Sequence, residues 1–217
     1  MAHLEEADGS HAMSSLEAYF FKQAFTGSSF ETFCDKDPYT FTTNDIVAVS
    51  MLSVSIPPSA SRWILGEGRA RLGNLLREID AEMTISSPVA DLGKMSPAWK
   101  LWNEVYSLPD VGETKTSKLL ATKRPFLFPI FDRHVSAAIQ VSPNSYWKPW
   151  QQFMQSEDGN KAARTVTEMA ASLNKSHLSP LRLLDIVIWM RQHGHKSITK
   201  TLVDEGKMIG VKYADPT

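Results

Sequence analysis

The residues whose types and spacing could carry out chemistry lie in one segment, between positions 108 and 135. The segment begins with the turn sequence Leu-Pro-Asp-Val-Gly, continues as a helical pattern that contains Thr114, and reaches Asp132 at the start of a further predicted helix. A turn that leads into a helix leaves the first backbone N–H groups unpaired, and these groups suit a phosphate. A carboxylate placed one element later can then face the group that is attached to the bound phosphate, such as a nucleotide.

This segment resembles the helix-hairpin-helix of the base-excision DNA glycosylase superfamily, in its endonuclease III-like group. The family pattern reads LPGVG, then a helix, and later a VDTHV-like run; the matching residues here are LPDVG at 108–112 and FDRHV at 131–135. Thr114 and Asp132 lie eighteen positions apart, the separation of the lysine position and the aspartate in the family. The chain as a whole resembles an uncharacterised bacterial protein family, which implies no activity.

The glycosylase resemblance implies that Asp132 is the catalytic residue. Hydrolysis of an N-glycosidic bond builds positive charge on the sugar, and a nearby carboxylate stabilises that charge and orients the attacking water. Asp132 also stands where it could cap a helix that begins at Arg133, and the two roles can coexist.

Two departures from the family pattern change the expected chemistry. Thr114 occupies the position of the lysine that attacks the sugar in bifunctional members. Lys115 lies one residue later, and one residue turns a side chain by about 100° around a helix. The resemblance therefore implies a monofunctional enzyme, which removes a base without cutting the strand. Asp110, which replaces the first hairpin glycine, is compatible with the turn but brings a negative charge to the phosphate site.

The resemblance also implies contacts with double-stranded DNA. The hairpin amides expected to hold a phosphate are those of Val111, Gly112, Glu113 and Thr114. The basic side chains expected to follow the DNA backbone are those of Lys115, Lys118, Lys123 and Arg124. The alternative is that these charged side chains are simply solvated, on one face of a helix and in a polar loop.

Charge is distributed unevenly along the chain. The net formal charge is −1, made up of −7 over residues 1–93, +4 over 94–148 and +2 over 149–217. The positive part coincides with the hairpin segment, which gives mild support to a nucleic-acid partner.

Composition excludes several kinds of site. Cys34 is the single cysteine, so an internal disulfide and a four-cysteine iron–sulfur cluster are both excluded, and we expect no metal and no cofactor. The pair His193 and His195 lacks a third ligand in the sequence pattern.

No apolar stretch is long enough to span a bilayer and no signal peptide is evident, so we expect a cytoplasmic protein without a membrane partner. We also expect it to be a monomer.

Apolar residues recur at helical spacing throughout, which predicts an all-α fold, arranged as two lobes around a cleft with a helix-hairpin-helix at 97–121. We expect residues 1–13 to be a tag or a disordered start, because the Gly-Ser-His-Ala-Met run resembles a cloning remnant, and residues 14–217 to form a single helical domain. The helices expected from capping and breaking signals cover 16–25, 43–54, two parts of 59–79 divided at 66–68, 97–107, 113–121 and 180–194. Within the last helix, Arg182 is the expected partner of Asp185.

Three classes of function follow from these features. The first is a monofunctional DNA glycosylase that excises a damaged or modified base. The second is a noncatalytic DNA-binding protein in which Asp132 serves only as a helix cap. The third is a helical protein without nucleic-acid activity, which would account most simply for Asp110 and for the nearly neutral net charge.

Overall fold

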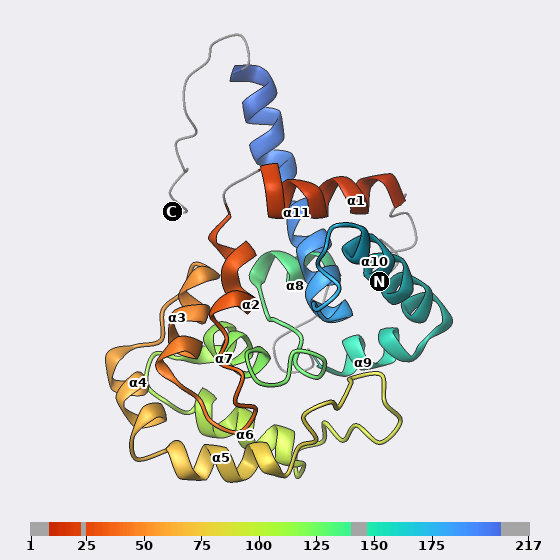
Figure 1. Ribbon diagram of the computed structural model, residues 1–217. Coiled ribbons are helices and arrows are strands. Elements are labelled where there is room, and N and C mark those ends of the chain that lie inside the picture. Colours follow the sequence, from red (N-terminus) through yellow and green to blue (C-terminus); the bar gives the residue numbers. More distant parts are fainter. Residues whose placement is uncertain (1–8, 23–24, 140–146, 205–217) are drawn as a thin grey trace.

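A computed structural model describes residues 9–22, 25–139 and 147–204, and within this part the side chains of residues 11–21, 25–139 and 147–192. Every regular element in the described part of the chain is helical (Figure 1). The prediction of an all-α fold is therefore confirmed. None of the described helices is both long enough and apolar enough to cross a membrane.

One set of helices follows the chain from residue 30 to residue 121, and its members pack on their neighbours and across the α3–α7 contact. This set forms the lower part of the molecule in Figure 1. Its members are α2 (Phe30–Phe33), α3 (Thr43–Met51), α4 (Pro58–Leu65), α5 (Arg69–Arg77), α6 (Pro97–Tyr106) and α7 (Gly112–Ala121).

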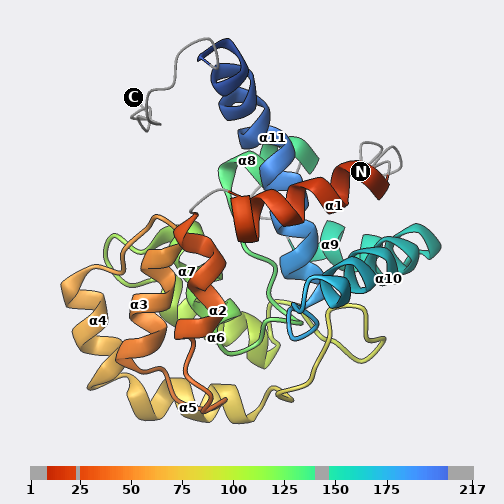
Figure 2. The same ribbon diagram turned by 45° about the horizontal axis from the view of Figure 1, so that its top comes forward.

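A second set joins the first helix of the chain to the last four. The first helix packs on α10 and α11, and α8 also packs on α11, as Figures 1 and 2 show from two directions. Its members are α1 (Gly9–Glu17), α8 (Arg133–Ile139), α9 (Trp147–Gln155), α10 (Glu157–Ser172) and α11 (Pro180–Asp204). One continuous cluster of buried apolar side chains runs through both sets.

Local signals in the sequence place several helix ends. Ser96 caps α6 by accepting a hydrogen bond from the Trp99 backbone N–H at 3.1 Å, with proline at the first helical position. Thr42 and Asp45 form a reciprocal capping box at the start of α3. The predicted interruption at residues 66–68 separates α4 from α5.

Three predicted helix boundaries are wrong. The first helix begins at Gly9 rather than Leu16, and Ala12 is buried in the core. The helix predicted over 43–54 ends at Met51. At the other end, α11 begins at Pro180 as predicted but continues to Asp204 instead of ending at Gly194. A single glycine costs a helix only about 1 kcal/mol, which its neighbours can offset. Residues 1–8 lie outside the described part.

Between Leu181 and Met190, α11 is buried on nearly all sides, as its continuous apolar pattern predicts. It therefore brings its polar residues into the interior, where each must find a partner. In the same core, Trp147 and Trp150 of α9 are buried, so these aromatic rings seat a helix rather than face solvent.

Candidate functional site around Asp132

The connection between α6 and α7 is a tight turn, as predicted for residues 108–112. Asp110 and Gly112 both have left-handed backbone conformations, with φ of 58° and 62°. Aspartate tolerates this region better than most residues and glycine adopts it freely, so the sequence Asp-Val-Gly suits the turn. The Val111 N–H donates to the Leu108 carbonyl at 3.3 Å, which closes the turn.

Beyond this turn, the N-terminal end of α7 points its backbone donors outward. The N–H groups of Gly112, Glu113 and Thr114 lie in the first turn of the helix, where no intrahelical acceptor exists for them. Val111 is different, because its N–H is already engaged within the turn. Lys115 is partly exposed, and its Nζ donates to the Asp110 carbonyl at 2.6 Å, which holds a positive charge over the turn.

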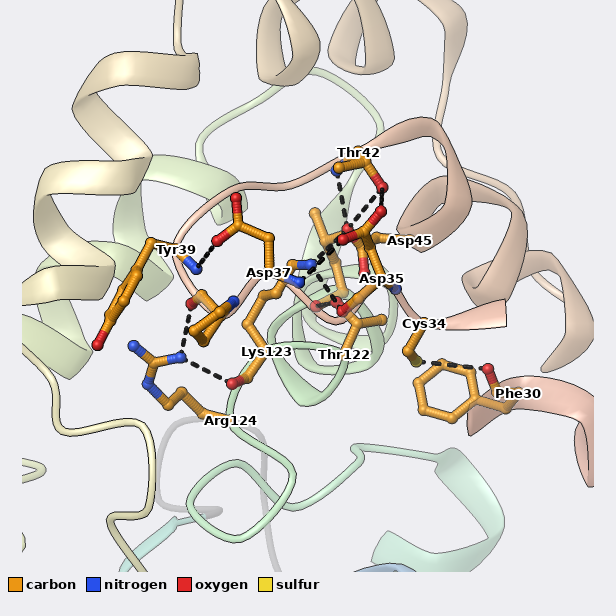
Figure 3. Close-up of polar contacts among 12 residues, drawn as sticks. Phe30, Cys34, Asp35, Asp37, Tyr39, Thr42, Asp45, Thr122, Lys123 and Arg124 are labelled. Atoms are coloured by element: carbon orange, nitrogen blue, oxygen red, sulfur yellow. Dashed lines mark hydrogen bonds and ion pairs between the residues drawn. The ribbon is translucent and has the colours of Figure 1, made fainter. Parts of the chain in front are cut away.

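The other predicted DNA contacts require a correction, because Lys118, Lys123 and Arg124 are buried. The Nζ of Lys123 lies 2.8 Å from Oδ2 of Asp45, and both side chains are fully enclosed. The same Nζ donates to the Asp35 carbonyl at 3.2 Å. Figure 3 shows this ion pair beneath the loop that carries Asp35 and Thr42.

Arg124 is the most enclosed of the three cations, with 0% of its surface exposed. Its guanidinium donates to the carbonyls of Pro38, Leu76 and Ile79, two of them at 2.8 and 2.9 Å. These carbonyls belong to segments that precede Arg124 by more than forty positions. The basic loop thus joins distant parts of the chain, and the predicted basic face is reduced to Lys115.

Asp132 stands at the N-terminal end of α8, with 20% of its side chain exposed. Its Oδ1 accepts the His134 backbone N–H at 2.8 Å, so the predicted capping role is confirmed. Its Oδ2 lies 3.9 Å from Nζ of Lys118. One carboxylate oxygen therefore holds the helix, and the other faces a cation.

Lys118 was named from the sequence as a DNA contact, but the structure gives it a different place. It was expected on the DNA-facing surface, yet only 5% of its side chain is exposed, and its Nζ donates to the Leu52 carbonyl at 2.9 Å. Burial lowers the pKa of the Lys118 amine, while the negative charges of Asp132 and Asp185 act in the opposite direction. A signal was present in the spacing, because Lys118 lies one helical turn after Thr114 on the same face.

Asp185 extends the cluster from α11. The predicted pair with Arg182 is confirmed by an Nη1 to Oδ2 distance of 2.7 Å. Burial raises the pKa of the Asp185 carboxyl to about 6, against the lowering effect of Arg182, and the nearby Asp132 raises it further. Among the described residues, no hydrogen bond reaches the buried Oδ1 of Asp185.

Two buried side chains near the partly exposed Asp132 have shifted pKa values. Lys118 is a buried amine with a lowered pKa, and Asp185 is a buried acid with a raised pKa. Environments that separate the pKa values of neighbouring groups are typical of sites for acid–base chemistry. The described part of the chain contains no group of three potential ligands that could hold a metal ion. The side chains of His193 and His195 lie outside that part.

One of three comparisons with known proteins found a match. Neither a comparison with curated proteins nor one with solved structures found a match. A family model matches residues 12–192, which span every described helix from α1 to the buried part of α11. The chain therefore belongs to a family of unknown function, DUF6308.

Proposed function

We propose that the protein is a monofunctional DNA glycosylase, which flips a damaged or modified base out of double-stranded DNA and hydrolyses its N-glycosidic bond. The observation that carries this proposal is the pairing of a tight hairpin with a partly exposed carboxylate, Asp132, one element later. In this proposal the two sets of helices serve as two lobes, and DNA approaches the hairpin and Asp132.

DNA would be held first at its backbone. The free amides of Gly112, Glu113 and Thr114 suit one phosphate, and the positive end of the α7 dipole adds to their attraction. Lys115 supplies the cation, because it is bound to the turn itself. The buried cations are not available for this contact, so a small footprint and a modest salt dependence are expected.

Base removal would then depend on Asp132. As the bond between the base and C1′ breaks, its electron pair leaves with the base and positive charge builds on the sugar. The Asp132 carboxylate stabilises that charge and orients the water that attacks C1′. Lys118 places its Nζ 3.9 Å from Oδ2 of this carboxylate, on the side away from the capping hydrogen bond.

The same geometry supports hydrolysis rather than strand cleavage. The lysine position of bifunctional enzymes is held by Thr114. Lys118 is bonded to the Leu52 carbonyl and almost fully enclosed, so its amine is poorly placed to attack a sugar. We therefore expect an intact abasic site as the product.

A noncatalytic DNA-binding protein is the second candidate, because Asp132 caps α8 and this role alone could explain its presence. A protein without nucleic-acid activity is the third, favoured by the burial of three of the four expected basic contacts.

A panel of duplexes separates these classes. Each duplex carries one damaged, alkylated or phage-modified base, and base release is read as strand breakage after alkali. Release from one member of the panel supports the glycosylase. DNA binding without release supports the second candidate, and a failure to bind any duplex at low salt leaves the third.

A further inference from the structure

A pocket of about 240 Å³ lies between α2, the connection from α7 to α8, and the start of α11. Its apolar lining includes Phe30, Phe128 and Ile130, which come from two of these parts. Its polar lining includes Glu31, Asp35, Lys36, His177 and Arg182. A pocket that combines apolar walls with fixed polar groups is the usual form of a small-molecule site.

The pocket lies close to Asp132. Ile130 lines it and precedes Asp132 by two residues, so their Cα atoms are within about 7 Å of one another. Arg182 also lines the pocket and is paired with Asp185, whose pKa responds to the charge of Asp132. The pocket and Asp132 are therefore neighbours in the fold.

Glu31 is a charged group on the pocket wall that can distinguish one ring from another by hydrogen bonding. Its Oε1 accepts from Nε of Arg182 at 2.8 Å, which fixes the carboxylate at the pocket wall. Among the described residues, Arg182 is the only one bonded to this carboxylate, so acceptor capacity is left. An ionised carboxylate accepts hydrogen bonds and donates none.

Arg182 cannot readily turn toward a ligand. Its guanidinium also donates to the Tyr19 hydroxyl at 2.8 Å, to the Gly27 carbonyl at 3.1 Å and to Asp185 at 2.7 Å. The cation is thus occupied by the protein, while the acceptor on Glu31 remains available.

We propose that this pocket binds a flat heteroaromatic base that carries an exocyclic amino group, with the ring against the apolar walls and the amino group donating to Glu31. The amino groups of adenine and cytosine meet this requirement. Their deaminated counterparts, hypoxanthine and uracil, place a carbonyl oxygen at the same position, which a carboxylate repels. The inference rests on the proposed function only in taking the source of the base to be a flipped nucleotide; a free base has the same chemistry.

The single cysteine gives a direct readout of occupancy. Cys34 lines the pocket, where its Sγ donates to the Phe30 carbonyl at 3.3 Å (Figure 3). Burial raises the pKa of the Cys34 thiol to about 12, so its alkylation is slow enough to follow by intact mass. A base in the pocket should slow this reaction further.

The experiment measures Cys34 alkylation by a small uncharged reagent in the presence of adenine, cytosine, hypoxanthine, uracil or a duplex. Titration calorimetry with the same four bases gives a second measurement on the wild-type protein. The test variant is Glu31→Gln, which keeps the shape of the side chain and an acceptor for Arg182. The matched control is Glu104→Gln, because Glu104 is also paired with an arginine, Arg71, but lies outside this pocket.

We expect adenine or cytosine to slow alkylation several-fold more than its deaminated counterpart, with the preference lost in Glu31→Gln and kept in Glu104→Gln. Equal alkylation with every base and with bound duplex, together with no calorimetric binding, would overturn the proposal. Protection by free bases without base release from any duplex would retain the pocket and reject the glycosylase. Base release without Cys34 protection would retain the glycosylase and reject the pocket.

Discussion

At the scale of the residue, burial decides what each basic side chain does. Lys115 is partly exposed and lies over the hairpin turn, whereas Lys123 is enclosed against Asp45 and Arg124 holds backbone carbonyls. A buried cation stabilises the fold only while its partners are present, because an unpaired charge in the interior is costly. An exposed cation costs little to remove and is available to a ligand.

The two lysines Lys123 and Lys115 give a matched comparison of these roles. Lys123→Met leaves the Asp45 carboxylate buried without its cation, and the free energy of unfolding should fall by about 3–5 kcal/mol. Lys115→Met should change it by about 0.5 kcal/mol or less, as for most surface substitutions, while weakening DNA binding. Urea denaturation measures both variants. Similar stabilities for the two would show that the buried pair is not important for the fold.

The raised pKa of Asp185 predicts a pH dependence of stability. An acid whose pKa is higher in the folded state than in the unfolded chain favours folding at low pH, and this contribution is lost as the pH rises through about 6. The stability of the wild type relative to Asp185→Asn should therefore decrease between pH 4 and pH 7, by about 3 kcal/mol at most.

Denaturation curves at several pH values measure this difference. A constant difference across the range, or one that grows with pH, would contradict a raised pKa for Asp185.

At the scale of the element, helix starts were predictable because their signals are local. Ser96 followed by Pro97, the capping box of Thr42 and Asp45, and the Ser-Pro pair before α11 each satisfy the first N–H groups within a few residues. The start of α1 and the end of α11 were predicted wrongly because they do not depend on local signals alone. The first helix is stabilised by packing on α10 and α11, which no local pattern reveals.

Changes at the two left-handed positions of the hairpin turn should affect different properties. No atom lies within 4 Å of a Cβ added at Gly112, so Gly112→Ala should lower the free energy of unfolding only through its positive φ, by about 1–2 kcal/mol.

At the other position, Asp110→Gly keeps the turn and removes a negative charge from the proposed phosphate site, so it should tighten DNA binding. Fluorescence anisotropy with a labelled duplex measures the affinities, and weaker binding by Asp110→Gly would remove the hairpin from the interface.

At the scale of the whole molecule, the candidate site depends on contacts between residues far apart in the sequence. The place of Asp132 before the first residue of α8 was predictable because its spacing from the hairpin is a property of the sequence. The partners that define its environment were not: Lys118 bonds to Leu52, and Arg182 bonds to Glu31 and Tyr19, each from another part of the chain. Lysine and arginine have long aliphatic stems, so the charged group can reach either solvent or a partner inside the fold. Their position in a basic loop therefore does not determine whether they are buried.

The most direct test of the account is base release by Asp132→Asn. Asparagine caps a helix about as well as aspartate, so the fold and DNA binding should change little. It lacks the negative charge that the sugar cation requires, and the rate of base release should fall by ~10² to 10³. The substrate is the modified duplex from which the wild type releases a base, and its products are measured on one gel with and without alkali. We expect breaks only after alkali in the wild type and almost none in the variant, whereas full activity of Asp132→Asn, or strand breaks before alkali, would contradict the account.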